Sequence, residues 1–206
     1  YANHHPNTSF ILGKTLVMGG SQQENRIGSG IYTGDISAIL MKNLPKPVKR
    51  RRTPESIALL ADWEVKLQKL ADYAIHSDIR AFVGVPSWML VLLKKIVEDT
   101  GKTIPELWPH IEVFFHGGVS FLPFQEQFKK LIPTDQMHYW ETYNASEGFF
   151  GVQYAPGSKD MLLLLDNEVY YEFIPMEQWD KENPETIPLE GVETGKQYAV
   201  VISTSG

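Results

Sequence analysis

The sequence contains no cysteine, which excludes disulfides, thiolate metal sites and a cysteine nucleophile. It lacks an apolar run of the roughly 18 residues that a membrane-spanning helix needs, and it lacks the basic-then-apolar start of a signal peptide. Basic residues are also in deficit: 19 Lys and Arg stand against 25 Asp and Glu, for a net charge of −6. A general nucleic-acid or membrane-surface partner is therefore not expected, and the cytoplasm is the expected location.

The residues that are present are sufficient for a core. Of 206 residues, 43% are hydrophobic and 12% aromatic, which suits one large domain. The chain opens at Tyr1 without an initiator methionine, and residues 200–206 read as a strand that runs into a glycine. We therefore expect an internal fragment of a longer protein.

The first two-thirds of the chain alternates strand and helix patterns. Strands are expected over residues 10–18, 79–85 and 111–115, and a glycine-rich loop over 28–34. Thr53-Pro54-Glu55 is typical of a helix start, and apolar residues then recur at helical spacing to Ala74. We expect Asp62 and Lys66 to form a pair on the outer face of this helix.

A second helix is expected from Pro86 through Val97. Because residues 88–93 are almost all apolar, it should be deeply buried. A third helix should follow Pro123.

Strand patterns dominate the remainder, over residues 137–143, 151–154, 161–165, 168–173 and 197–204. The turn at 165–168 suits a two-residue hairpin. The fold class expected is α/β, a mixed sheet with helices, with more antiparallel β toward the C-terminus. We divide it into an alternating half, residues 1–135, and a mainly β part, residues 136–206.

Two strand ends suggest a nucleotide site. Tyr143-Asn-Ala-Ser-Glu-Gly-Phe-Phe-Gly151 follows one expected strand, and His116-Gly117-Gly118 follows another. A flat ring can cover adenine, glycine admits backbone close to the base, and a carboxylate can hold a Mg²⁺ that bridges phosphates. The alternatives are a surface glutamate at 147, a core tyrosine at 143 and a plain tight turn at the glycines.

Large apolar residues near the expected loops could wall a pocket for an apolar acid, or could be ordinary core. They are Val85, Trp88, Met89, Phe149, Phe150, Tyr170 and Tyr171. The basic run at residues 49–52 is interpreted as solvated. His4-His5 is interpreted as an exposed pair, since no third ligand lies at a useful spacing.

These motifs resemble the acyl-acid amido synthetases, the auxin-responsive Gretchen Hagen family within the acyl-adenylate-forming superfamily. The stretch 143–151 is similar to its Tyr-x-x-Ser-Glu-x-x-x-Gly motif, and residues 115–123 to its glycine-rich nucleotide loop. Residues 84–88 resemble the turn at its acyl pocket, 170–175 its aromatic-Glu-Phe-x-Pro strand, and 200–206 the strand before its Tyr-Arg-x-Gly-Asp motif.

The resemblance implies a two-step reaction: a carboxylic acid is adenylated by ATP, and an amine or amino acid then takes the acyl group and releases AMP. It implies that Ser146 contacts the α-phosphate and that Glu147 serves Mg²⁺. The residues implied to bind nucleotide are Gly117, Gly118, Val119, Tyr143, Asn144, Ala145 and Ser146. Those implied to border the acyl group are Val85, Met89, Phe149, Tyr170 and Tyr171.

Three parts of the family pattern are absent from this chain: the Ser/Thr/Gly-rich phosphate loop, the aspartate that holds the ribose, and the mobile C-terminal domain with its lysine. We therefore expect the 206 residues alone to be inactive. Two functional alternatives stay open, an acyl-coenzyme A ligase of the same superfamily and a non-catalytic nucleotide- or acid-binding module. A third alternative is an α/β domain whose loops only mimic the motif.

Overall fold

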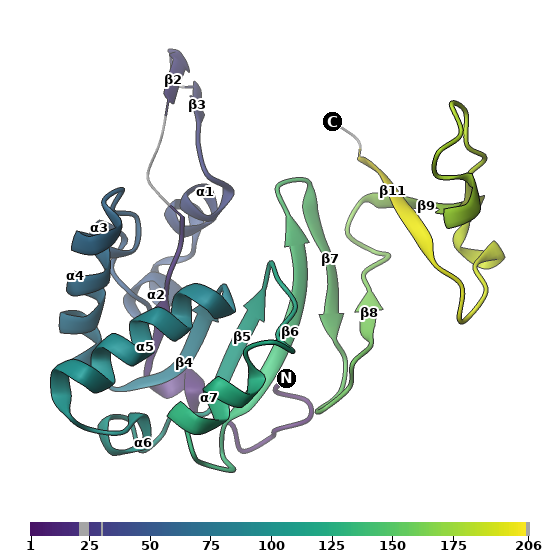
Figure 1. The fold of residues 1–206 in the computed structure, drawn as a ribbon. Coiled ribbons are helices and arrows are strands. Elements are labelled where there is room, and N and C mark those ends of the chain that lie inside the picture. Colours follow the sequence, from purple (N-terminus) through teal and green to yellow (C-terminus); the bar gives the residue numbers. More distant parts are fainter. Residues whose placement is uncertain (21–24, 30, 205–206) are drawn as a thin grey trace.

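The computed structural model describes residues 1–20, 25–29 and 31–204. Its main sheet has six strands in the order β1-β4-β5-β6-β7-β8 (Figure 1). β1, β4, β5 and β6 are parallel to one another, whereas β7 and β8 continue the sheet antiparallel. The strands are β1 (Lys14–Val17), β4 (Ile79–Gly84), β5 (Val113–Gly117), β6 (His138–Ala145), β7 (Gly148–Gln153) and β8 (Met161–Leu163). The expected mixed α/β fold is confirmed.

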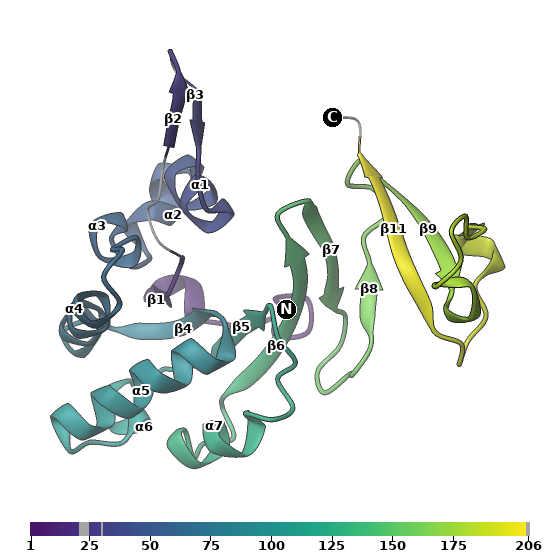
Figure 2. The same cartoon turned by 45° about the horizontal axis from the view of Figure 1, so that its top comes forward.

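Helices cover one face of the parallel strands (Figure 2). They are α4 (Trp63–Ile75), α5 (Pro86–Thr100), α6 (Ile104–Leu107) and α7 (Gln125–Leu131). Successive strand residues point to opposite faces, so Phe82 and Phe114 meet these helices while their neighbours face away. Both phenylalanines are fully buried in the main core, with Leu92 and Leu93 of α5.

A second, three-stranded antiparallel sheet follows, in the order β10-β9-β11. Its strands are β9 (Val169–Pro175), β10 (Ile187–Pro188) and β11 (Tyr198–Thr204), with short 3-10 turns η2 (Met176–Gln178) and η3 (Leu189–Gly191). Phe150 of β7 shares a buried cluster with Tyr171 and Phe173 of β9. This cluster joins the two sheets.

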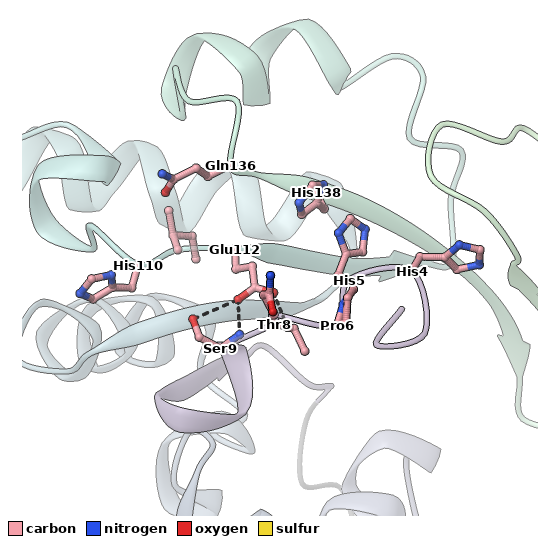
Figure 3. A pocket seen from close by; sticks show the side chains of 11 residues that line it. His4, His5, Pro6, Thr8, Ser9, His110, Glu112, Gln136 and His138 are labelled. Atoms are coloured by element: carbon pink, nitrogen blue, oxygen red, sulfur yellow. Dashed lines mark hydrogen bonds between the residues drawn. The ribbon is translucent and has the colours of Figure 1, made fainter.

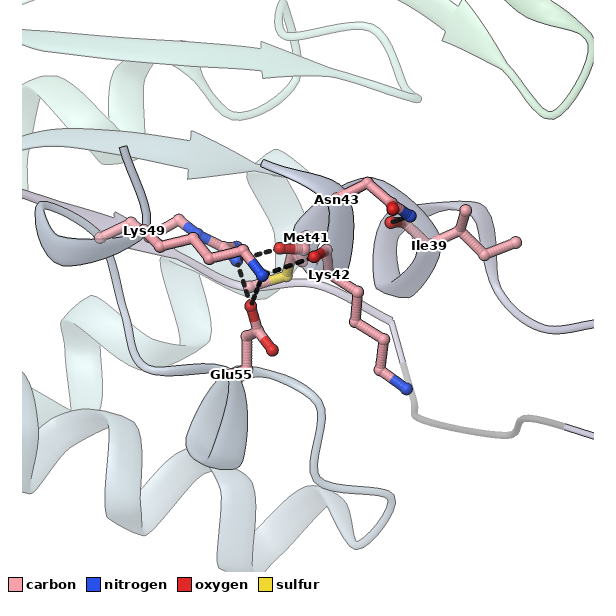
Figure 4. A network of polar contacts seen from close by, with 7 residues as sticks. Ile39, Met41, Lys42, Asn43, Lys49 and Glu55 are labelled. Atoms are coloured by element: carbon pink, nitrogen blue, oxygen red, sulfur yellow. Dashed lines mark hydrogen bonds and ion pairs between the residues drawn. The ribbon is translucent and has the colours of Figure 1, made fainter. Parts of the chain in front are cut away.

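The N-terminal part contains η1 (Phe10–Leu12), β2 (Asn25–Gly28), β3 (Ile31–Thr33), α1 (Ile36–Asn43), α2 (Lys46–Arg50) and α3 (Glu55–Ala58). Two cations of the basic run link these helices (Figure 4). Arg52 is only 5% exposed, donates to the Met41 carbonyl and pairs with Glu55 at 3.1 Å. Lys49 reaches the same carboxylate at 3.0 Å. The interpretation of a fully solvated run is therefore wrong for Arg52.

Four further expectations need correction in the segment before α5. Residues 10–12 form a 3-10 turn, so the strand starts only at Lys14. The expected loop at 28–34 includes the last residue of β2 and all of β3, which pairs with β2 antiparallel. The expected long helix is two helices, because α3 ends at Ala58 and the Asp62 carboxylate caps a new helix at the Val65 amide. Lys66 is buried and forms no outer-face pair with Asp62.

The other corrections concern α5 and the turn before β9. Trp88 and Val91 are 40% and 45% exposed, because α5 buries one face only. β8 and β9 lie in different sheets, so residues 165–168 do not form a hairpin. Glu168, at φ +62°, carries the left-handed turn there.

Candidate functional site

The carboxyl ends of the parallel strands place three loops at one edge of the sheet. Gly84 pairs with His116, and Gly117 pairs with Thr142 on β6. Gly84 adopts φ +150°, and an added Cβ there would lie 3.2 Å from the Met18 carbonyl oxygen after β1. In open α/β sheets, ligands bind at this edge.

Gly117 and Gly118 are at positions where only glycine fits. A Cβ on Gly117 would stand 2.4 Å from the Thr142 carbonyl oxygen, and Gly118 has φ +82°. The Thr142 hydroxyl donates to the His116 carbonyl at 3.1 Å, which fixes the end of β5 against β6. A Cβ on Gly118 would contact Val85 Cγ2 at 3.5 Å, so the loop after β5 lies against the loop after β4.

The serine–glutamate motif folds as a β-hairpin and not as a single turn after a strand. Tyr143 to Ala145 belong to β6, residues 146–147 form a two-residue turn, and β7 begins at Gly148. Tyr143 is 51% exposed, and its ring centroid lies 5.4 Å from that of Phe150. The hairpin thus presents a half-exposed aromatic ring directly after the residue that pairs with Gly117.

Ser146 and Glu147 lie at the exposed tip of this hairpin. Ala145 is three residues past Thr142, so the tip stands about 10 Å beyond the end of β5, and Figure 1 shows the hairpin projecting past that strand. Within the described residues, neither side chain has a hydrogen bond to the protein. The structure thus places Tyr143 beside the glycines and sets Glu147 farther out, with its carboxylate free for a ligand.

The residues implied for the acyl group do not share one surface. Met89 is fully buried in the main core and Tyr171 is 5% exposed, whereas its neighbour Tyr170 is 61% exposed on the other face of β9. Phe149 is 43% exposed, and its carbonyl accepts from the Asn167 side chain. Val85 is half-buried beside Gly118.

His116 is a buried polar residue at the end of β5 whose burial the sequence motifs did not indicate. It is 3% exposed and its ring stacks on Phe121 with centroids 4.2 Å apart. Burial lowers the pKa of His116 to about 4, so the imidazole is neutral near pH 7. Its Nδ1 has no partner among the described residues. The signal available was its position, next to the glycine pair on the helix-facing side of a strand.

Two surface cavities lie at the opposite edge, near the amino ends of the parallel strands. One, of about 390 Å³, is lined by His5, Glu112 and His138 among others (Figure 3). The other, of about 600 Å³, includes Arg50 and Arg51. Because the motif is at the carboxyl edge, neither cavity belongs to it.

The N-terminal segment docks beside the first cavity. The Glu112 carboxylate accepts from Tyr1 Oη at 2.7 Å and from the Ser9 amide at 2.8 Å, and also from Thr8. His5 lies against His138 with ring centroids 4.1 Å apart. Within the described part of the chain, no group of three or more His, Cys, Asp or Glu could hold a metal ion. No described helix is long and apolar enough to cross a membrane.

Comparisons with known proteins identify related sequences and a related fold. The GH3 family N-terminal domain matches residues 10–137, and the GH3 family central domain matches residues 162–206. Indole-3-acetic acid-amido synthetase GH3.3 of Arabidopsis thaliana is 29% identical over 108 residues, which cover 49% of this chain and 18% of the relative. GH3.6 from the same plant is 25% identical over 211 residues, covering 87% and 31%.

The fold also matches a solved structure. GH3.15 acyl acid amido synthetase superposes with a TM-score of 0.71 at 15% identity, over 97% of this chain and 45% of that chain. This chain spans less than a third of the length of these two curated relatives. Since one family model covers more than half of its residues, the chain belongs to the GH3 family, as the motifs at 115–123 and 143–151 indicated.

Proposed function

We propose that the parent protein of this chain adenylates a carboxylic acid with ATP and transfers the acyl group to an amine or amino acid. The chain would supply much of its adenylation domain. Two curated relatives are named indole-3-acetic acid-amido synthetases, and GH3.15 is named an acyl acid amido synthetase. The observation that carries the proposal is the junction of the glycine pair with Tyr143.

This junction suits adenine. Gly117 and Gly118 present bare backbone at the end of β5, and the half-exposed Tyr143 ring follows the paired Thr142. Aromatic rings stack on bases whatever their sequence context. In the proposal, Tyr143 stacks on adenine, and the glycine loop with Val119 borders the base. Asn144 and Ala145 line the path to the phosphates.

Glu147 is suited to bind a Mg²⁺ ion whose other ligands would come from ATP phosphates and water. Mg²⁺ is usually bound by one or two carboxylates plus substrate phosphates and water. Glu147 is exposed and has no partner among the residues that the structure describes, so it is a suitable ligand. When bound, the ion would neutralise phosphate charge. Ser146, the adjacent turn residue, would donate its hydroxyl to the α-phosphate.

We propose that the acid is apolar and carries an aromatic ring, like the indole acid in the names of the relatives. Of the residues implied to border it, Val85, Phe149 and Tyr170 have exposed or half-exposed side chains. In the proposal Met89 and Tyr171 act only indirectly, because Met89 is buried in the main core and Tyr171 against Phe150. We further propose that the phosphate loop, ribose aspartate and C-terminal lysine are supplied by other parts of a cytoplasmic parent, so that the 206 residues alone do not turn over.

The test is ATP–pyrophosphate exchange by the full-length parent with a panel of carboxylic acids. Acid-dependent exchange that falls at least about 100-fold in Glu147→Gln is expected, as for loss of a metal ligand. Glu168→Gln, at an exposed turn, is the matched control. Amine and thiol acceptors are then compared for the second step. ATP binding without exchange for any acid would favour the binding module, and a thiol preference would favour the coenzyme A ligase.

A further inference from the structure

Lys66 of α4 is a buried cation at the carboxyl edge of the sheet. It is 4% exposed, and its ammonium donates to the Gly19 carbonyl at 3.1 Å and to the Gly20 carbonyl at 2.9 Å. A buried ammonium is costly unless it is paired and hydrogen-bonded. Burial lowers the pKa of Lys66, and the nearby Asp35 carboxylate opposes this effect. The lysine therefore has a specific task in holding two successive carbonyls.

The segment held by Lys66 is fixed from a second side. The Gly20 amide donates to Ser37 Oγ at 2.8 Å, and the Ser37 amide donates to Asp35 Oδ1 at 2.8 Å as the cap of α1. A Cβ on Gly20 would stand 2.3 Å from Asp35 Oδ2. The backbone at residues 19–20 is thus clamped between α4 and the first turn of α1.

This clamped segment directly supports the loop that borders the proposed acyl site. The Met18 amide donates to the Val83 carbonyl at 3.2 Å, and the Met18 carbonyl lies close against Gly84. Val85 follows Gly84 and contacts the position of Gly118. α4 also contacts the helix that follows Val85. Trp63, one turn before Lys66, packs edge-on against Trp88 of α5 with ring centroids 5.9 Å apart.

We propose that Lys66 is a positioning residue for the carboxylic acid substrate: by holding the Gly19 and Gly20 carbonyls it sets the Met18–Gly84 contact and hence the placement of Val85. This inference rests on the proposed function. The residues proposed to bind adenine lie farther along the sheet from Gly84: Gly117 is on the next strand, β5, and Tyr143 is on the one after it, β6. Loss of Lys66 should therefore affect the acid more than ATP.

The experiment measures KM for acid and for ATP separately in pyrophosphate exchange by the full-length parent. Lys66→Met should raise KM for the acid about tenfold or more, because the Met18–Gly84 contact loses its support and Val85 is displaced from its place beside the acid. KM for ATP should stay within about twofold. Lys66→Arg keeps the charge and donors and should recover part of the loss. Lys69→Met, at an exposed site on the same helix, should match the wild type.

Ser37→Ala is the second variant, chosen because it removes the other clamp without burying a new group. It should raise KM for the acid in the same direction by about threefold or more. Unchanged acid KM in both variants, with normal wild-type exchange, would overturn the positioning role alone. Equal increases in KM for the acid and for ATP would also overturn it, because they indicate general destabilisation. A wild-type parent with no acid-dependent exchange would overturn the proposed function, and this inference with it.

Discussion

Gly117 lies directly against Thr142, so that a Cβ at 117 would stand 2.4 Å from the Thr142 carbonyl oxygen. Gly117→Ala should therefore force β5 and β6 apart at their carboxyl ends and destabilise the fold by about 1–3 kcal/mol. Two measurements on the parent check this: its melting temperature should fall, and its KM for ATP should rise. Gly151→Ala is the control, because a Cβ there meets its neighbours at an ordinary 3.5 Å. Equal effects at the two positions would contradict the crowding argument.

Tyr143 is half-exposed, so its removal should affect binding more than folding. Tyr143→Ala is expected to raise KM for ATP about tenfold, since stacking of an aromatic ring on a base contributes about 1–3 kcal/mol. Tyr143→Phe should retain most of the affinity because the stacking face remains. Tyr154→Ala, at a similarly exposed tyrosine, provides the comparison in the same assay. An unchanged KM in Tyr143→Ala would remove this residue from the adenine site.

His116 should make stability depend on pH in a defined window. Its pKa is about 4 in the folded chain, and the ordinary value is 6.5, because burial disfavours the charged ring. Between these values the unfolded chain binds more protons, so stability falls as pH drops from about 6.5 to 4 and is fully retained above that window. The loss attributable to this group is about 3 kcal/mol at most.

Urea unfolding at several pH values checks this. In His116→Phe, which keeps an aromatic ring against Phe121, the slope between pH 6.5 and 4 should be smaller than in the wild type. His110→Gln changes an exposed histidine and should leave the slope as it is. If His116→Phe keeps the full wild-type slope, another group causes it.

Glu112 should determine whether the N-terminal segment docks. Burial raises the pKa of this carboxyl, but hydrogen bonds from Thr8, Tyr1 and Ser9 outweigh it, and the pKa ends below its ordinary value. The N-terminal segment is therefore fully docked above the pKa that Glu112 has in the unfolded chain. Docking weakens as the pH falls through the lower pKa that Glu112 has in the folded chain.

Hydrogen exchange of the parent tests the docking. Glu112→Ala should speed exchange at the Ser9 amide about tenfold or more, because that amide loses its acceptor. Glu126→Ala, at an exposed carboxylate in a surface pair, should leave it protected. Unaltered protection in Glu112→Ala would show that other contacts hold the segment.

Local patterns were enough for the broad architecture. Apolar runs and helix spacing indicated parallel strands with helices and then antiparallel strands, which the topology confirms. Helix phase also predicts the burial of Lys66, which lies four and eight residues before the buried Leu70 and Ala74. A residue on that stripe faces the core, and Lys66 is therefore buried instead of paired with Asp62 on the outer face.

The sequence by itself determined the fold class and the two motif-bearing strand ends, because periodicity, glycine and turn chemistry are properties of neighbouring residues. Only the tertiary structure decided which side chains are free to act. Tyr170 and Tyr171 look alike in sequence, yet strand alternation exposes one and buries the other against Phe150. The Lys66 ammonium binds the carbonyls of Gly19 and Gly20, which precede it by 47 and 46 positions in the chain. Such contacts depend on how whole elements pack, which no local pattern specifies.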